Sequence, residues 1–139
     1  MSFPIKVPIN ALTSCLFIIN SLYLSMKNDI VYRNSFILLT LSSLAFHTTK
    51  NTIIHKIDKI FVYNVVVQGG IRFFYYYKNS TFHSSLVIFN FLLTVYFYCY
   101  GYCYSKYSFD KDQQTAEFFH AFVHIFGSLG HLSIAYLIE

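Results

Sequence analysis

Two histidines in the last third of the chain are spaced so that they could share one metal ion. His120 and His124 are four residues apart at the start of a long apolar run. On a helix, side chains at positions i and i+4 lie on one face, about 5–6 Å apart at Cβ, and zinc is bound by imidazole nitrogens at roughly 2.0–2.1 Å. An ionisable pair within an apolar run is costly and indicates a functional site. Among six histidines, however, one such pair arises by chance in about one sequence in four.

Three residues elsewhere in the chain could complete a hydrolytic site around this pair. His47 offers a third imidazole, and three protein ligands plus one open position are typical of catalytic zinc. The open position would hold a water that acts as the nucleophile. Ser43 lies one turn before His47 and could hold that water or an oxyanion, and Asp58 could serve as general base. Taken singly, Ser43 is more often a small residue at a helix contact, and Asp58 a charge at a helix N-terminus.

The composition predicts that membrane helices position these residues. The chain has 139 residues, of which 55% are hydrophobic and only 12% charged, and its mean hydropathy is +0.47; soluble domains carry about 25% charged residues. The apolar residues fall into long blocks that suit helices of about 17–25 residues. We therefore predict an all-α, multi-pass integral membrane bundle in one domain. Its five expected spans are residues 9–26, 30–49, 57–77, 83–104 and 116–138.

The order of these spans places the candidate residues at one face of the membrane. With five crossings, the second span ends, and the third and fifth begin, on the side that carries the N-terminus. His47, Asp58, His120 and His124 should therefore lie at a common depth. Six lysines fall on that side and four lysines or arginines on the other, which favours a cytoplasmic position for the N-terminal side.

Several other classes of function are disfavoured. The net charge of +4 is scattered through the loops, so we expect no nucleic-acid partner, and no GxGxxG or P-loop pattern occurs. Cys15, Cys99 and Cys103 fall inside apolar runs and are expected to be buried filler rather than disulfides. The first apolar run lacks a convincing cleavage site, so we expect a retained helix.

Three more features carry structural predictions. His131, seven residues after His124, is expected to pack in the core. His55 is expected to be solvated in a polar connector before the third span. Gly69-Gly70 should kink or end the third helix.

The residues with candidate chemistry also resemble a known family. Ser43-Leu44-Ala45-Phe46-His47, then Asp58, then His120-Ala121-Phe122-Val123-His124 resembles the CREST superfamily of membrane hydrolases. That group includes alkaline ceramidases, adiponectin-receptor-like proteins and GPI-remodelling lipid hydrolases. The resemblance implies that His47, His120 and His124 bind zinc, that Ser43 and Asp58 contact the zinc-bound water, and that a lipid amide or ester such as ceramide is the substrate.

The chain departs from that family in length. Family members have seven membrane helices, and the two that are missing here would lie between Asp58 and His120; the tryptophan common before the last histidine is replaced by Val123. A shortened chain is consistent with an active minimal enzyme, with a homo-oligomer that closes its cavity between copies, or with a decayed relative. We therefore expect a zinc-dependent intramembrane hydrolase. The alternatives are a non-catalytic membrane protein or lipid sensor that retains the metal site, and proton movement by the histidines without a metal.

Overall fold

The computed structural model describes residues 8–138, and all regular structure within that range is helical. The predicted all-α bundle is thus confirmed. Residues 8–138 form five rods, because α1 and α2 are separated only at Cys15 and because α5 continues through a π-helical turn, η2, into α6. The bounds are α1 Ile9–Ser14, α2 Leu16–Met26, α3 Ile30–Thr49, α4 Thr52–Tyr76, α5 Thr81–Val95, η2 Tyr96–Tyr100, α6 Gly101–Tyr104 and α7 Gln113–Leu137.

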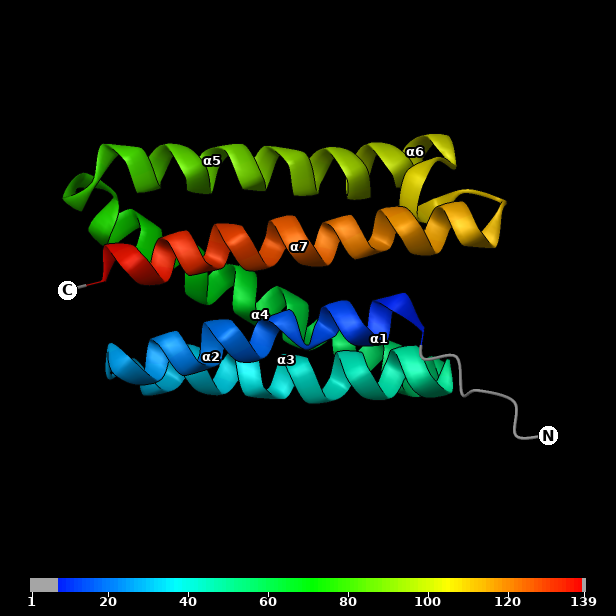
Figure 1. Cartoon of the computed structure of the whole chain (residues 1–139), viewed down its shortest axis with the longest axis horizontal. Helices are drawn as coiled ribbons and strands as arrows, with labels where there is room; N and C mark the ends of the chain where they lie inside the picture. The colour runs from blue at the N-terminus through cyan, green and yellow to red at the C-terminus, as the bar shows by residue number, and fades with distance from the viewer. Residues whose placement is uncertain (1–7, 139) are drawn as a thin grey trace.

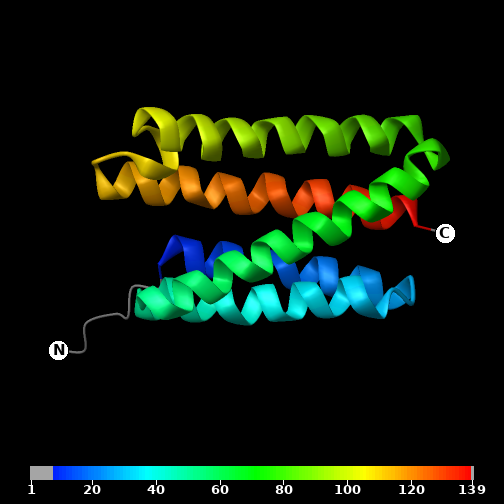
Figure 2. The same cartoon turned by 180° about the vertical axis from the view of Figure 1, so that it is seen from behind.

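The rods are arranged in two pairs joined by a diagonal helix. α5 packs along α7, and α1 and α2 pack along α3 on the other side of the bundle (Figure 1). α4 packs on α3 and crosses obliquely to the far end, where it leads into α5 (Figure 2). α1 also contacts α7. The end of the bundle where α1 begins therefore brings together three elements: α1, the last turns of α3 and the first turns of α7.

Three helices begin two to five residues before the predicted spans, because each has a polar residue that caps its N-terminus. The side chain of Asn51 accepts hydrogen bonds from the backbone N–H groups of Ile53 and Ile54, at 2.8 and 3.2 Å. Ser80 and Asp112 cap α5 and α7 in the same way. Ser, Asn and Asp are preferred at this position because they satisfy backbone donors that the first turn leaves unpaired. One consequence is that His55 lies on α4 and not in a connector, and its ring stacks on Phe46 with centroids 4.4 Å apart.

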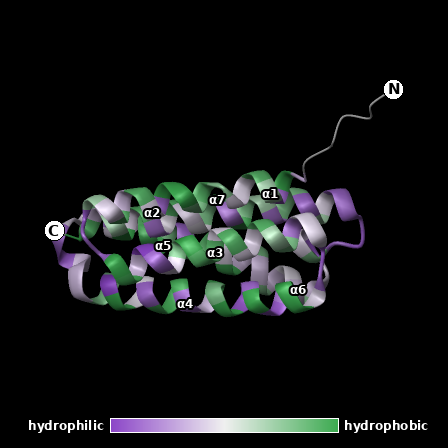
Figure 3. Cartoon of the chain, turned by 90° about the horizontal axis from the view of Figure 1, so that it is seen from below, coloured by the Kyte–Doolittle hydropathy of each residue, from purple (hydrophilic) through white to green (hydrophobic). Residues whose placement is uncertain are grey.

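The outer surface of the bundle is largely apolar. Within residues 8–138, three segments are long and apolar enough to cross a membrane: Ile9–Met26, Thr81–Phe109 and Gln113–Leu137. Large apolar side chains such as Leu22, Leu41 and Phe91 are more than half exposed, whereas about as many polar as apolar residues are buried. Hydrophilic residues gather at the two ends, although α4 also carries them along its length (Figure 3). This polar-inside arrangement is the one that a lipid environment favours.

Two predictions about small residues are wrong. α4 runs without a break through Gly69 and Gly70. Gly69 instead allows a close approach, since a Cβ added there would lie 2.6 Å from the His131 ring and 2.8 Å from the Tyr32 hydroxyl. The three cysteines are free and exposed. A sequence window shows that a residue lies in an apolar helix but not which side of that helix faces outward.

Candidate metal centre

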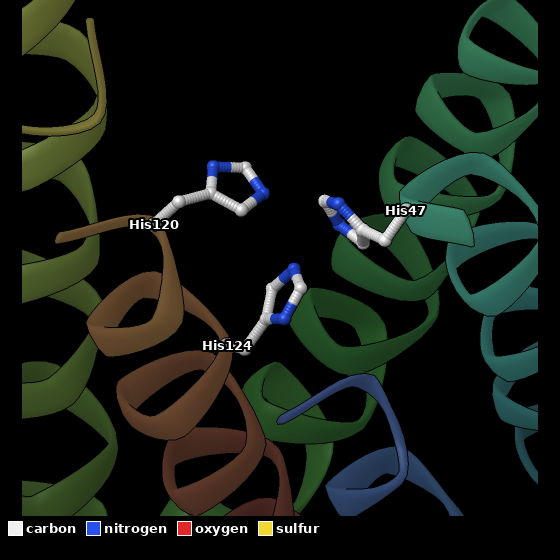
Figure 4. A group of neighbouring side chains, drawn as sticks. All are labelled: His47, His120 and His124. Atoms are coloured by element: carbon white, nitrogen blue, oxygen red, sulfur yellow. The ribbon is translucent and has the colours of Figure 1, made fainter. Parts of the chain in front are cut away.

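The structure brings His47, His120 and His124 together at one end of the bundle. Each offers one ring nitrogen, and these three atoms lie within 4.8 Å of one another. His47 comes from the last turn of α3, and the other two come from the first turns of α7, so the three rings point into one space (Figure 4). The i, i+4 pair shares one face of α7, with ring centroids 4.8 Å apart. We call these three residues the histidine cluster.

Of the three members of the histidine cluster, His47 is the one whose burial is least explained by packing alone. Its side chain is only 3% exposed, and neither Nδ1 nor Nε2 has a hydrogen-bond partner in the described part of the chain. Leaving a buried polar group unpaired costs about 1–3 kcal/mol. Both neighbouring histidine rings approach it edge-on, with centroids 5.2 Å away. An unpaired buried imidazole facing two others is what a site for a cation requires.

The donor set fits zinc. Three neutral imidazole nitrogens are ligands that zinc accepts, and tetrahedral coordination at roughly 2.0–2.1 Å would place them on the order of 3.3 Å apart. The observed limit of 4.8 Å is wider by about 1.5 Å, which rotation of the rings can supply. With three protein ligands, one position of a tetrahedral ion remains for water or substrate.

Ser43 is near this end of the bundle but is engaged by another hydroxyl. Its Oγ lies 2.9 Å from the Oγ of Ser14 in α1, and Ser14 donates to the backbone oxygen of Asn10 at 2.6 Å. Because Ser14 has one proton to give, Ser43 is the donor between the two serines. Ser43 therefore has lone pairs free to accept a hydrogen bond, but its own proton is in use. The role in holding an oxyanion that the sequence suggested would require the Ser14 bond to break.

Asp58 is buried and hydrogen-bonded to α3. Its carboxylate accepts from Ser42 Oγ at 2.9 Å, and the residue is 5% exposed. Ser42 precedes His47 by five residues, roughly 7–8 Å along a helix axis. Among the described residues, Asp58 makes no hydrogen bond to the histidine cluster. Sequence reasoning missed Ser42, because which of two adjacent serines faces α4 depends on how α3 is rotated.

A contact from the first helix was also missed. Thr13 Oγ1 lies 2.9 Å from His124 Nδ1, although 111 positions separate the two residues in sequence. Phe17, in the next helical turn, contacts the same imidazole edge-on, with centroids 5.3 Å apart. No motif indicates such a pairing, since it depends on α1 lying against α7.

Charged side chains border the histidine cluster. Lys50 ends α3 in a left-handed backbone conformation, and its Nζ lies 3.7 Å from Glu117 Oε1 in α7. Lys59 of α4 places its ammonium 4.7 Å from the ring centre of Tyr98 in η2. These contacts connect α3 to α7, and α4 to the π-helical turn, near the open end of the site.

His131 belongs to a separate polar cluster toward the opposite end of the bundle, near the start of α3. Its Nδ1 lies 2.5 Å from the hydroxyl of Tyr32, and the ring of Tyr32 lies under the guanidinium of Arg72 at 5.2 Å. Arg72 donates to both carboxylate oxygens of Asp29, at 2.7 and 2.8 Å. The Arg72 guanidinium holds the pKa of the Asp29 carboxyl below its usual value. We call these four residues the polar brace, because they connect α3, α4 and α7.

Comparisons of the chain with protein-family models, with curated proteins and with solved structures found no match. The function of this chain is therefore inferred from the geometry of the site and from the motif resemblance.

Proposed function

We propose that this protein is an integral membrane, zinc-dependent hydrolase that cleaves an amide or ester bond of a membrane lipid. One observation carries the proposal: three imidazoles from two helices each place a ring nitrogen within 4.8 Å of the others, and the buried His47 has no hydrogen-bond partner among residues 8–138. A zinc ion held by three protein ligands supplies a Lewis acid and activates water at neutral pH. The resemblance to the CREST superfamily, with ceramide as its best-known substrate, agrees with this chemistry.

The chain's own residues would divide the work as follows. His47, His120 and His124 would hold the ion. Asp58, kept in place by Ser42, would take the proton from the attacking water and pass it to the leaving group. Ser43 would accept a hydrogen bond from that water through its free lone pairs. The outer surface of the bundle is apolar, so a lipid could approach the site from the bilayer.

A second candidate is a non-catalytic membrane protein or lipid sensor that retains the metal. One observation favours it: two surface hollows of the bundle lie at the opposite end, beside Lys27 and Ile138. Neither hollow is lined by a member of the histidine cluster, next to which a hydrolase would bind its substrate. A homo-oligomer could form a substrate cavity there between copies.

The first experiment is metal analysis of protein purified in mild detergent. We expect about one zinc per chain in the wild type and loss of zinc in His47→Ala, His120→Ala and His124→Ala. His83→Ala is a matched control, because His83 stacks on Tyr136, far along α7 from the site. A folded wild-type protein without bound zinc would refute the proposal.

The second experiment separates the enzyme from the sensor. Ceramide and acyl phospholipids in mixed micelles are offered to wild type and to Asp58→Asn. An enzyme should lose about 10²–10⁴-fold in turnover, which is the usual contribution of a general base, while zinc content stays unchanged. If the wild type contains zinc and turns over none of these lipids, the non-catalytic candidate is favoured.

A further inference from the structure

We infer that Thr13 is a positioning residue for the metal centre, where its hydroxyl fixes the His124 imidazole so that Nε2 faces the other two histidines. The inference rests on the proposed metal site and adds to it a contribution from the first helix. Thr13 Oγ1 is 2.9 Å from His124 Nδ1 and 3.3 Å from the backbone oxygen of Asn10.

The positions of the protons follow from these two contacts. A carbonyl oxygen can only accept, whereas a ring nitrogen of a neutral imidazole can donate or accept. We therefore assign the single hydroxyl proton of Thr13 to Asn10, and in this assignment the Thr13 oxygen accepts from His124 Nδ1–H. A neutral imidazole with its proton on Nδ1 has its lone pair on Nε2, and that lone pair is what a metal requires.

The orientation of the ring agrees with this assignment. One ring nitrogen of His124 points toward the rings of His47 and His120, and the other points away (Figure 4). The nitrogen that contacts Thr13 is Nδ1, which leaves Nε2 on the side of the cluster. Phe17, buried on α2, meets the same ring edge-on and limits its rotation. The rod formed by α1 and α2 therefore determines both the tautomer and the orientation of the His124 imidazole.

Such partners contribute to metal binding even though they never touch the ion. Histidine ligands usually donate their second N–H to an oxygen, and loss of that oxygen typically costs 10–100-fold in metal affinity. Here the oxygen comes from a threonine in a helix of six residues. The neighbouring Ser14 binds Ser43, so α1 contacts the site at two adjacent positions.

The test is a Co²⁺ and Zn²⁺ titration against a competing chelator, on detergent-purified full chain. Thr13→Val keeps the shape of the side chain but removes the hydroxyl, and we expect 10–100-fold weaker binding and an altered cobalt visible spectrum. Thr13→Ser keeps the hydroxyl and should bind within a few-fold of wild type. Thr40→Val is the matched control, because Thr40 donates only to Phe36 of its own helix, at 2.7 Å; its affinity should not change.

Two results would overturn the inference without touching the proposed function. One is a wild type that binds metal together with a Thr13→Val variant that binds it equally tightly. The other needs no variant: ¹⁵N NMR of the metal-free wild type should show His124 protonated at Nδ1, and protonation at Nε2 would contradict the assignment. A wild type that binds neither ion would instead refute the metal site itself.

Discussion

The two polar clusters inside this bundle differ in whether their hydrogen-bonding groups find partners. In the polar brace, Asp29, Tyr32, Arg72 and His131 each bond to another member or lie against it. In the histidine cluster, His47 is as deeply buried, but neither of its ring nitrogens has a hydrogen-bond partner among residues 8–138. A satisfied polar network stabilises one arrangement of helices, whereas an unpaired buried group lowers stability unless something binds to it. The paired groups of the polar brace therefore indicate a structural role, whereas the unpaired His47 indicates a binding site.

The largest expected difference between the clusters is in their response to zinc. Free zinc at about 100 times its dissociation constant should stabilise the wild type by about 2.7 kcal/mol. His47→Ala should abolish that shift, whereas Tyr32→Phe should keep it in full, because the brace does not contact the ion. Thermal unfolding in detergent, with and without chelator, measures both. If zinc still stabilises His47→Ala, the two clusters do not differ in their response to zinc.

Adding one methyl group next to the polar brace should lower the free energy of unfolding. Gly69→Ala places its Cβ against His131 and Tyr32, and overpacking of this kind costs about 1–3 kcal/mol. Gly70→Ala is the control: apart from the adjacent backbone of α4, no atom of the described residues lies within 4 Å of its added Cβ. The Gly70→Ala variant should therefore gain up to about 1 kcal/mol of stability from higher helix propensity. Unfolding of the chelated proteins gives both values. Equal stabilities would mean that α4 and α7 are not in close contact.

The brace should also show a pH dependence that comes from the carboxyl group of Asp29. The pKa of Asp29 is lowered from its ordinary 3.8, first by its hydrogen bond with Arg72. A lowered carboxyl pKa stabilises the fold above the unfolded value, and that stability is lost as pH falls through the folded value. At neutral pH the free energy of unfolding of the wild type should thus exceed that of Asp29→Asn by about 1.5 kcal/mol. This is the lower end of the range for hydrogen bonds to charged groups. The gap should shrink below about pH 4; a gap that stays constant to pH 3 would contradict this.

The smallest effects concern single polar groups in metal-free protein. Tyr32→Phe removes one hydrogen bond to His131 and should cost about 1 kcal/mol. His47→Leu removes a polar group that has no partner, so it should be neutral or slightly stabilising. Chemical denaturation in the presence of chelator compares the two. If His47→Leu destabilises as much as Tyr32→Phe, His47 has a structural role instead.

The sequence by itself determined the class of fold and the identity of the histidine cluster. Long apolar blocks predict helices, because they have the length that a helix needs to cross a bilayer. The spacing of His120 and His124 fixes their shared face, and the order of the rods brings His47 to the same end. The starts of α4, α5 and α7 were also available from the capping residues Asn51, Ser80 and Asp112.

Only the tertiary structure decided how the helices are rotated and which neighbours they meet. Ser42 rather than Ser43 holds Asp58, Thr13 meets His124, and Gly69 admits His131. These contacts join residues that are 16 to 111 positions apart in sequence. A local pattern specifies the face of one helix, but packing against the others sets the angle at which that face is presented. For that reason the three clustered histidines could be predicted from the sequence alone, whereas the groups that contact them could not.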